Sequence, residues 1–101
     1  MAEESGGYTI MRSAFENCTW LQTAEFGPCY SVVEGYAFAG CEKLCELTFS
    51  SGLETVKSHA FMNCKSLDYI YFRGTQDEMM AISKWPWWNL RAGKCTWTVK
   101  E

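Results

Sequence analysis

A 23-residue repeat is the feature that most constrains how this chain can fold. The dipeptide Ala-Phe occurs three times at this interval, and a cysteine and then a leucine follow each copy at three-residue steps. All six phenylalanines of the chain fall on two phases of the repeat. The residues on these phases are Phe15, Phe38, Phe61, Cys18, Cys41, Cys64, Leu21, Leu44, Leu67, Phe26, Phe49 and Phe72. Self-similarity at this period predicts a solenoid, in which stacked units bury these ladders in a shared core.

Each repeat unit contains a segment with the alternation of a β-strand. In the segment 67–72, the apolar Ile70 and Phe72 alternate with Tyr69 and Tyr71. Because side chains of a strand point to opposite faces in turn, one face of this segment is apolar. Equivalent segments occur at 21–26 and 44–49. Stacked units therefore predict a narrow parallel sheet whose inner face carries the leucine and phenylalanine ladders.

The residue before each ladder cysteine indicates how a short turn ends. Asn17, Gly40 and Asn63 occupy this position. These residue types tolerate a left-handed backbone better than others do. We therefore predict one helical or 3₁₀ turn in each unit, ended by a residue with positive φ.

This pattern of Ala-Phe, cysteine, leucine and an alternating strand resembles the BspA-like leucine-rich repeats, over roughly residues 9–99. The resemblance implies an α/β repeat fold, a short leucine-rich-repeat-like solenoid of three stacked 23-residue units with a narrow parallel sheet. It also implies a C-terminal cap made of a short helix over 76–84 and a closing strand over 95–99, with Met79, Met80 and Ile82 seating the helix. Members of this family are mostly repeat domains of bacterial surface and secreted proteins, linked to adhesion and protein recognition. The resemblance implies no catalytic activity.

The repeats and the cap divide the chain into three parts. We expect a flexible lead-in over 1–8, three leucine-rich-type repeats over 9–74 and a capping segment over 75–101. No basic, apolar signal region or long apolar span is visible, which favours a soluble chain that makes no membrane contact. Its compartment stays open between the cytoplasm and, for a fragment of a larger surface protein, the cell exterior.

Charge and cysteine usage restrict the chemistry. The net charge of −3 argues against direct nucleic-acid binding, which needs a basic face. The ladder cysteines are expected to be buried, reduced thiols, whereas Cys29, Cys45 and Cys95 lie off the ladder and are predicted to be more exposed. A disulfide between two of these three stays open. No spacing of cysteines suits a metal, and no cofactor is predicted.

Catalysis has little support in the sequence. His59 is the only histidine, and its repeat equivalents are Ser13 and Tyr36. We interpret His59 as a surface or packing residue, with a Cys–His dyad as the alternative. No catalytic residue is predicted.

Aromatic residues near the C-terminus form the predicted partner-binding surface. Tyr69 and Tyr71 project from the outer face of the last strand, and tryptophans follow in the capping loop. Tyr, Trp and Arg are enriched at binding hot spots. The predicted contact residues are Tyr69, Tyr71, Arg73, Trp85, Trp87 and Trp88. The alternative is that tryptophans plug the solenoid, with Trp87 or Trp88 as the plug and Trp85 as the contact.

The sequence thus predicts a non-catalytic protein-binding module that uses the strand face and the aromatic C-terminal cap. One alternative is a free-standing cytoplasmic inhibitor or adaptor, of the kind that a phage encodes against a host defence enzyme. Another is a carbohydrate-binding repeat domain, because aromatic faces stack on sugars. The first strand, at 21–26, has an uncovered edge, which would suit a homodimer or an added target strand.

Overall fold

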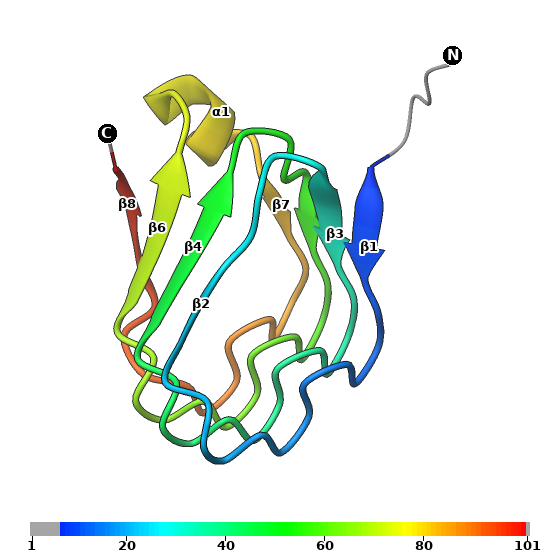
Figure 1. The fold of residues 1–101 in the computed structure, drawn as a ribbon, viewed down its shortest axis with the longest axis vertical. Helices are drawn as coiled ribbons and strands as arrows, with labels where there is room; N and C mark the ends of the chain where they lie inside the picture. The colour runs from blue at the N-terminus through cyan, green and yellow to red at the C-terminus, as the bar shows by residue number, and fades with distance from the viewer. Residues whose placement is uncertain (1–6, 101) are drawn as a thin grey trace.

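The computed structural model describes residues 7–100, which form about four turns of a β-solenoid with two parallel sheets (Figure 1). One sheet consists of β1 (Tyr8–Ile10), β3 (Tyr30–Val33), β5 (Thr55–Val56) and β7 (Ser83–Lys84). The other consists of β2 (Thr23–Glu25), β4 (Glu46–Ser50), β6 (Tyr69–Arg73) and β8 (Thr96–Val99). Each turn contributes one strand to each sheet, so the predicted solenoid is confirmed.

The sheet β2-β4-β6-β8 is the one that the alternating pattern predicts. Its register aligns Ala24 with Leu47, Leu47 with Ile70 and Ile70 with Trp97. The first two of these pairings follow the 23-residue repeat, so each repeat phase becomes one ladder on the inner face of β2, β4 and β6. The period of the sequence is therefore the stacking register of these three strands, whereas β8 is displaced from it.

The second sheet was not predicted, so the expectation of a single narrow sheet was incomplete. Ile10, Val33 and Val56 point inward from β1, β3 and β5 and are almost fully buried. These strands have only two to four residues. Such a length is too short for a period-two pattern to be visible in the sequence.

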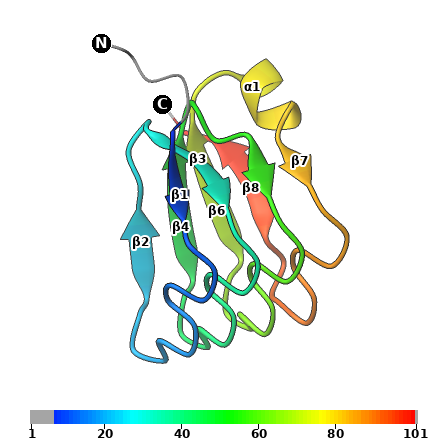
Figure 2. The same ribbon diagram turned by 90° about the vertical axis from the view of Figure 1, so that its right-hand side faces the viewer.

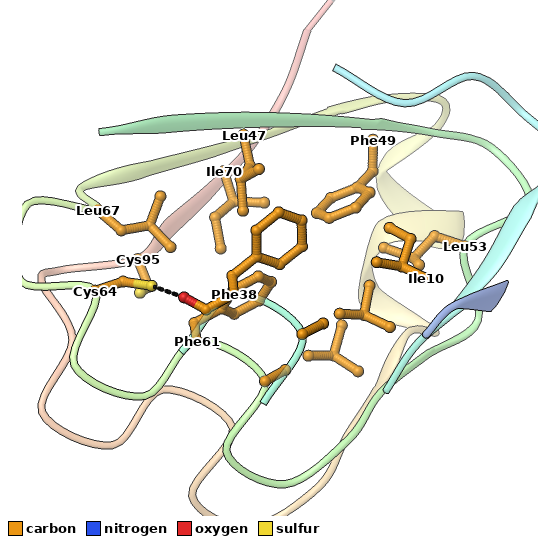
Figure 3. Packing of buried hydrophobic residues seen from close by; sticks show 14 of the residues in the cluster. Ile10, Phe38, Leu47, Phe49, Leu53, Phe61, Cys64, Leu67, Ile70 and Cys95 are labelled. Atoms are coloured by element: carbon orange, nitrogen blue, oxygen red, sulfur yellow. Dashed lines mark hydrogen bonds between the residues drawn. The ribbon is translucent and has the colours of Figure 1, made fainter. Parts of the chain in front are cut away.

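The core lies between the two sheets, where the repeat ladders meet (Figure 3). Phe38, Phe49, Phe61 and Phe72 are fully buried, whereas the first-turn member Phe15 is only partly buried. The other first-turn ladder residues, Cys18, Leu21 and Phe26, are also partly buried. Among the described residues, the first turn has a neighbouring turn on one side only, so its ladder residues are less buried than those of the later turns.

Ladder thiols satisfy carbonyl groups of the turn before. The Cys64 thiol donates to the Phe38 carbonyl at 2.9 Å, which Figure 3 shows as a dashed line. The Cys41 thiol donates to the Phe15 carbonyl at 3.1 Å. Each of these two cysteines therefore packs as a small apolar residue and also links two successive turns.

The segment expected to be a cap forms the fourth turn of the solenoid. Val56 pairs with Lys84, five residues beyond the position that the 23-residue period would give. The difference equals the length of α1 (Gln76–Met80), which is inserted between β6 and β7. Thr75 caps this helix in a capping box with Glu78, so a local signal begins the insertion.

Two tryptophans and a lysine close the C-terminal end of the core. Trp88 contacts the edge of the Phe61 ring at 6.0 Å between centroids, and Trp97 lies 6.1 Å from Trp88. Lys84, at the position of Val56, holds its ammonium group 5.3 Å from the centroid of the Trp97 ring. These three large side chains thus cover the end of the core, where the ladder residues of the third turn would otherwise be exposed.

Some predicted details of the termini need correction. Met79 and Ile82 are buried under α1, but Met80 is 71% exposed and does not seat the helix. Of the expected lead-in, residues 1–6 lie outside the described residues, and Tyr8 begins β1. Within residues 7–100, no helix has the length and apolar character needed to span a bilayer.

Candidate binding surface

The base of the solenoid contains two rows of residues with a left-handed backbone. One row consists of Asn17, Gly40, Asn63 and Arg91, with φ between 59° and 78°. The other consists of Ser13, Tyr36, His59 and Trp87, with φ between 60° and 65°. The first row mostly uses residue types that adopt this conformation at low cost. Three of the four residues in the second row carry rings, and their backbone is strained at positive φ. The sequence did not predict this row.

The three rings of the second row stack into one column with the guanidinium of Arg12, the residue before Ser13. The Arg12 guanidinium lies 4.8 Å from the centroid of the Tyr36 ring. The His59 ring lies 5.1 Å from Tyr36 and 6.2 Å from Trp87, at interplanar angles of 5° and 24°. We call this column of Arg12, Tyr36, His59 and Trp87 the aromatic ridge. It crosses all four turns, which Figure 2 shows side by side.

A shallow groove of about 250 Å³ runs beside the aromatic ridge. We call it the corner groove, and it is lined by Arg12, Glu34, Gly35, Tyr36, Lys57, Ser58, His59 and Trp85. A Cβ atom on Gly35 would lie 3.0 Å from the Ser58 carbonyl oxygen, so the lack of a side chain keeps the floor of the groove low.

The wall opposite the ridge combines an ion pair with an aromatic ring. The Lys57 ammonium lies 3.0 Å from a Glu34 carboxylate oxygen and 5.1 Å from the centroid of the Trp85 ring. The two side chains of the ion pair are about 30% exposed, so water partly screens their attraction. This arrangement fixes the Trp85 ring while leaving Trp85 itself 43% exposed.

The structure divides the predicted contact residues among three places. Trp85 and Trp87 lie at the corner groove and the aromatic ridge, and Trp87 is 63% exposed. Trp88 is half-buried and packs on the core cluster, the position that the alternative interpretation gives to the plug. Tyr69, Tyr71 and Arg73 lie on β6, in the other sheet. The predicted surface is therefore not continuous.

The outer face of β6 is partly occupied by internal contacts. The Tyr69 and Tyr71 rings stack at 6.0 Å, and the Lys100 ammonium lies 4.8 Å from the Tyr71 ring centroid. Arg73 reaches across β4 to Glu25 on β2, where the two charged groups are 3.2 Å apart. Thr48 of the intervening strand is only 6% exposed. Arg73 is thus already paired within the sheet, which weakens its case as a contact residue.

The cysteines differ from the prediction at two positions, because the ladder residue Cys18 is only partly buried and Cys95 is buried. All six are free, and Cys29 and Cys45 are exposed. Cys95, which was expected to be partly exposed, is buried at the base of β8, where its N–H donates to the Leu67 carbonyl. Burial, assisted by the nearby Asp68 carboxylate, raises the pKa of Cys95 to about 11.

The buried thiols of Cys41 and Cys64 interact with each other. This interaction lowers the pKa of Cys41 and, together with burial, raises the pKa of Cys64. His59 stacks between Tyr36 and Trp87 in the aromatic ridge. Within residues 7–100, no group of three His, Cys, Asp or Glu residues is placed to hold a metal ion.

The chain has stacked turns, parallel sheets and exposed aromatic side chains. These features define a solenoid repeat protein, a class that typically provides a binding scaffold. The family model for the BspA-type leucine-rich repeat region matches residues 4–84, in six copies. The chain belongs to the BspA-type leucine-rich repeat family, and the resemblance in its sequence is confirmed. Comparisons with curated proteins and with solved structures gave no match.

Proposed function

We propose that this protein is a non-catalytic module that binds another protein through the corner groove and the exposed faces of Trp85 and Trp87. The observation that carries this proposal is the placement of Tyr36, His59 and Trp87 at left-handed positions. The neighbouring row shows that Asn or Gly suffices for the same backbone geometry. The aromatic side chains are therefore better explained by what they present to a partner than by the turn that they form.

The energetics of the ridge support this interpretation. A left-handed conformation costs an ordinary residue roughly 1–2 kcal/mol. Three ring-bearing residues of the ridge have this conformation, whereas their two stacked pairs contribute about 0.5–1.5 kcal/mol each, so the stacking offsets only part of the strain. The ridge then brings little net stability to the fold, while it holds three rings in fixed orientations. Rigid aromatic groups are effective in recognition because they lose little entropy on binding.

The dimensions of the corner groove suit an extended polypeptide. Neighbouring strands of a sheet are about 4.8 Å apart, so the four turns of the ridge span about 14 Å. An extended segment of roughly four residues covers this length. The groove offers ring faces, a guanidinium and an ion pair, which together match both apolar and polar side chains of such a segment.

A selection from a displayed library of random peptides would test this proposal. Wild type should enrich a family of peptides, and the Trp85→Ala/Trp87→Ala variant should lose at least about tenfold in affinity for them. Trp20→Ala is the matched control, because Trp20 is 72% exposed but lies in the first turn. Circular dichroism would establish that both variants fold.

Three results would contradict the proposal. Enrichment of no peptide by wild type would remove the support for peptide recognition. Equal losses in the Trp20→Ala control would show that the groove has no special role. Binding of soluble oligosaccharides that depends on Trp85 and Trp87, without peptide binding, would favour the carbohydrate alternative.

An inhibitor or adaptor would use the same surface, so the same experiment tests that alternative function.

A further inference from the structure

Charge is strongly segregated along this chain. The segment 79–100 contains four cationic residues and no carboxylate. Residues 7–74, which form the other three turns, contain five cationic residues and seven carboxylates, a net charge of −2. The four cations are Lys84, Arg91, Lys94 and Lys100, and all of them are exposed.

The solenoid gathers these four cations at one end of the molecule. All of them lie between β7 and the end of the fourth turn, which is the last turn in the stack (Figure 2). Trp85 and Trp87 belong to the same turn. We call this set of four cations and two tryptophans the basic end. Salt bridges formed among the described residues, Glu34–Lys57 and Glu25–Arg73, use none of its cations.

We infer that the basic end docks on an acidic surface of the partner protein, an inference that rests on the proposed binding function. Trp85 and Trp87 are the apolar anchors, and Arg91 and Lys94 face carboxylates around them. A rim of one sign of charge accelerates encounter with a partner of the opposite sign and excludes partners of the same sign. The other three turns, residues 7–74, carry a net charge of −2, so an acidic partner is attracted to this end more than to those turns.

Nucleic acid suits the basic end less well. Binding to a phosphate backbone commonly engages about six to ten cationic contacts, more than this end provides. Two of its four cations already lie over rings of the protein, Lys84 over Trp97 and Lys100 over Tyr71. The surrounding negative charge also repels a long polyanion. A folded protein presents carboxylates in a limited patch, which matches the size of this surface.

Direct binding measurements would test the inference. The probes are a fluorescently labelled peptide of repeated Glu-Asp-Leu-Phe units and its Gln-Asn-Leu-Phe counterpart, which has the same apolar content. We expect the acidic peptide to bind about tenfold more tightly at low ionic strength, with a smaller difference at physiological salt. Arg91→Glu/Lys94→Glu should weaken binding of the acidic peptide at least about tenfold.

The matched control is Lys43→Glu/Lys65→Glu, which makes the same charge change at two exposed lysines outside the fourth turn. This control should change the affinity less than about threefold, because long-range attraction is screened by salt. A loss equal to that of Arg91→Glu/Lys94→Glu would overturn the inference, as would equal binding of the two peptides or binding of neither. Peptides from the library selection that depend on Trp85 and Trp87 would still support the proposed function in that case.

Two further outcomes would assign the basic end to another occupant and overturn the inference. One is tighter binding of single-stranded oligothymidine than of the acidic peptide. The other is self-association of wild type in sedimentation measurements that the Arg91→Glu/Lys94→Glu variant abolishes, which would identify a second copy of the chain as the occupant.

Discussion

The imidazole of His59 lies parallel to the phenol ring of Tyr36, with 5.1 Å between centroids and 5° between planes, although both residues have a left-handed backbone. The repeat produces this relationship, because the two residues occupy the same phase of successive turns. Stacking and strain thus coexist at one position, and their balance can be measured.

Substitutions in the two left-handed rows should separate these effects. Asn63→Ala should lower the free energy of unfolding by about 1 kcal/mol, because alanine lacks the tolerance of asparagine for positive φ. Asn63→Gly should be nearly neutral, and His59→Gly should change stability by less than about 1 kcal/mol, since relief of strain offsets lost stacking. Urea unfolding would measure all three. A neutral Asn63→Ala variant would argue against the left-handed assignment.

Neighbouring tryptophans should respond very differently to truncation. Trp88→Ala should destabilise the protein by about 3 kcal/mol, because it opens the end of the core beside Phe61 and Trp97. Trp87→Ala should cost less than about 1 kcal/mol, since its ring is 63% exposed and loses only the contact with His59. Thermal and urea unfolding would compare the two variants. A larger loss for Trp87→Ala would reverse the assignment of plug and contact.

The buried thiol of Cys95 should make stability depend on pH in the alkaline range. Its pKa is raised to about 11 in the folded protein, whereas an unfolded cysteine has a pKa of about 8.5. Its contribution is therefore fully present below about pH 8.5 and is lost as the pH rises through the folded value, by up to about 1.4 kcal/mol per pH unit.

A variant without this thiol isolates its effect from other groups that titrate at high pH. Cys95→Ala should show a flatter decline of the unfolding free energy between about pH 9 and 11 than wild type does. Cys29→Ala, which removes an exposed thiol, should retain the wild-type slope. Identical slopes for Cys95→Ala and wild type would show that Cys95 is not held protonated by burial.

Much of the fold could be predicted because the repeat places each ladder residue on a fixed phase. The 23-residue spacing between Ala14-Phe15 and Ala37-Phe38 predicts both the stacking register and the inner face of β2, β4 and β6. The residues on these phases are apolar and lie in the core, so their residue type and their spacing together predict where they lie. The second sheet depends instead on backbone pairing over very short strands, for which side chains leave little signal.

The fourth turn was hidden by two changes that occur together. α1 shifts the phase by five residues, so Trp87 no longer aligns with His59 at the 23-residue period. The ladder positions also change identity, with Trp97 following Ile70 and Lys84 following Val56. When the five residues of α1 are left out of the count, Trp87 aligns with His59 and Tyr36. The residues of the aromatic ridge can therefore be recognised in the sequence only when the insertion of α1 is taken into account.

The C-terminal plug also separates the length of the protein from its recognition chemistry. Trp88 packs on Phe61 of the third turn, and Trp97 stacks on Phe49 of the second turn. The exposed Trp85 and Trp87 belong to the fourth turn as well. A duplicated 23-residue unit placed between the first and second turns would extend both sheets and leave the contacts of the fourth turn intact, but it would separate Arg12 from Tyr36. Gene duplication could therefore lengthen the corner groove while the tryptophans at its C-terminal end keep their places.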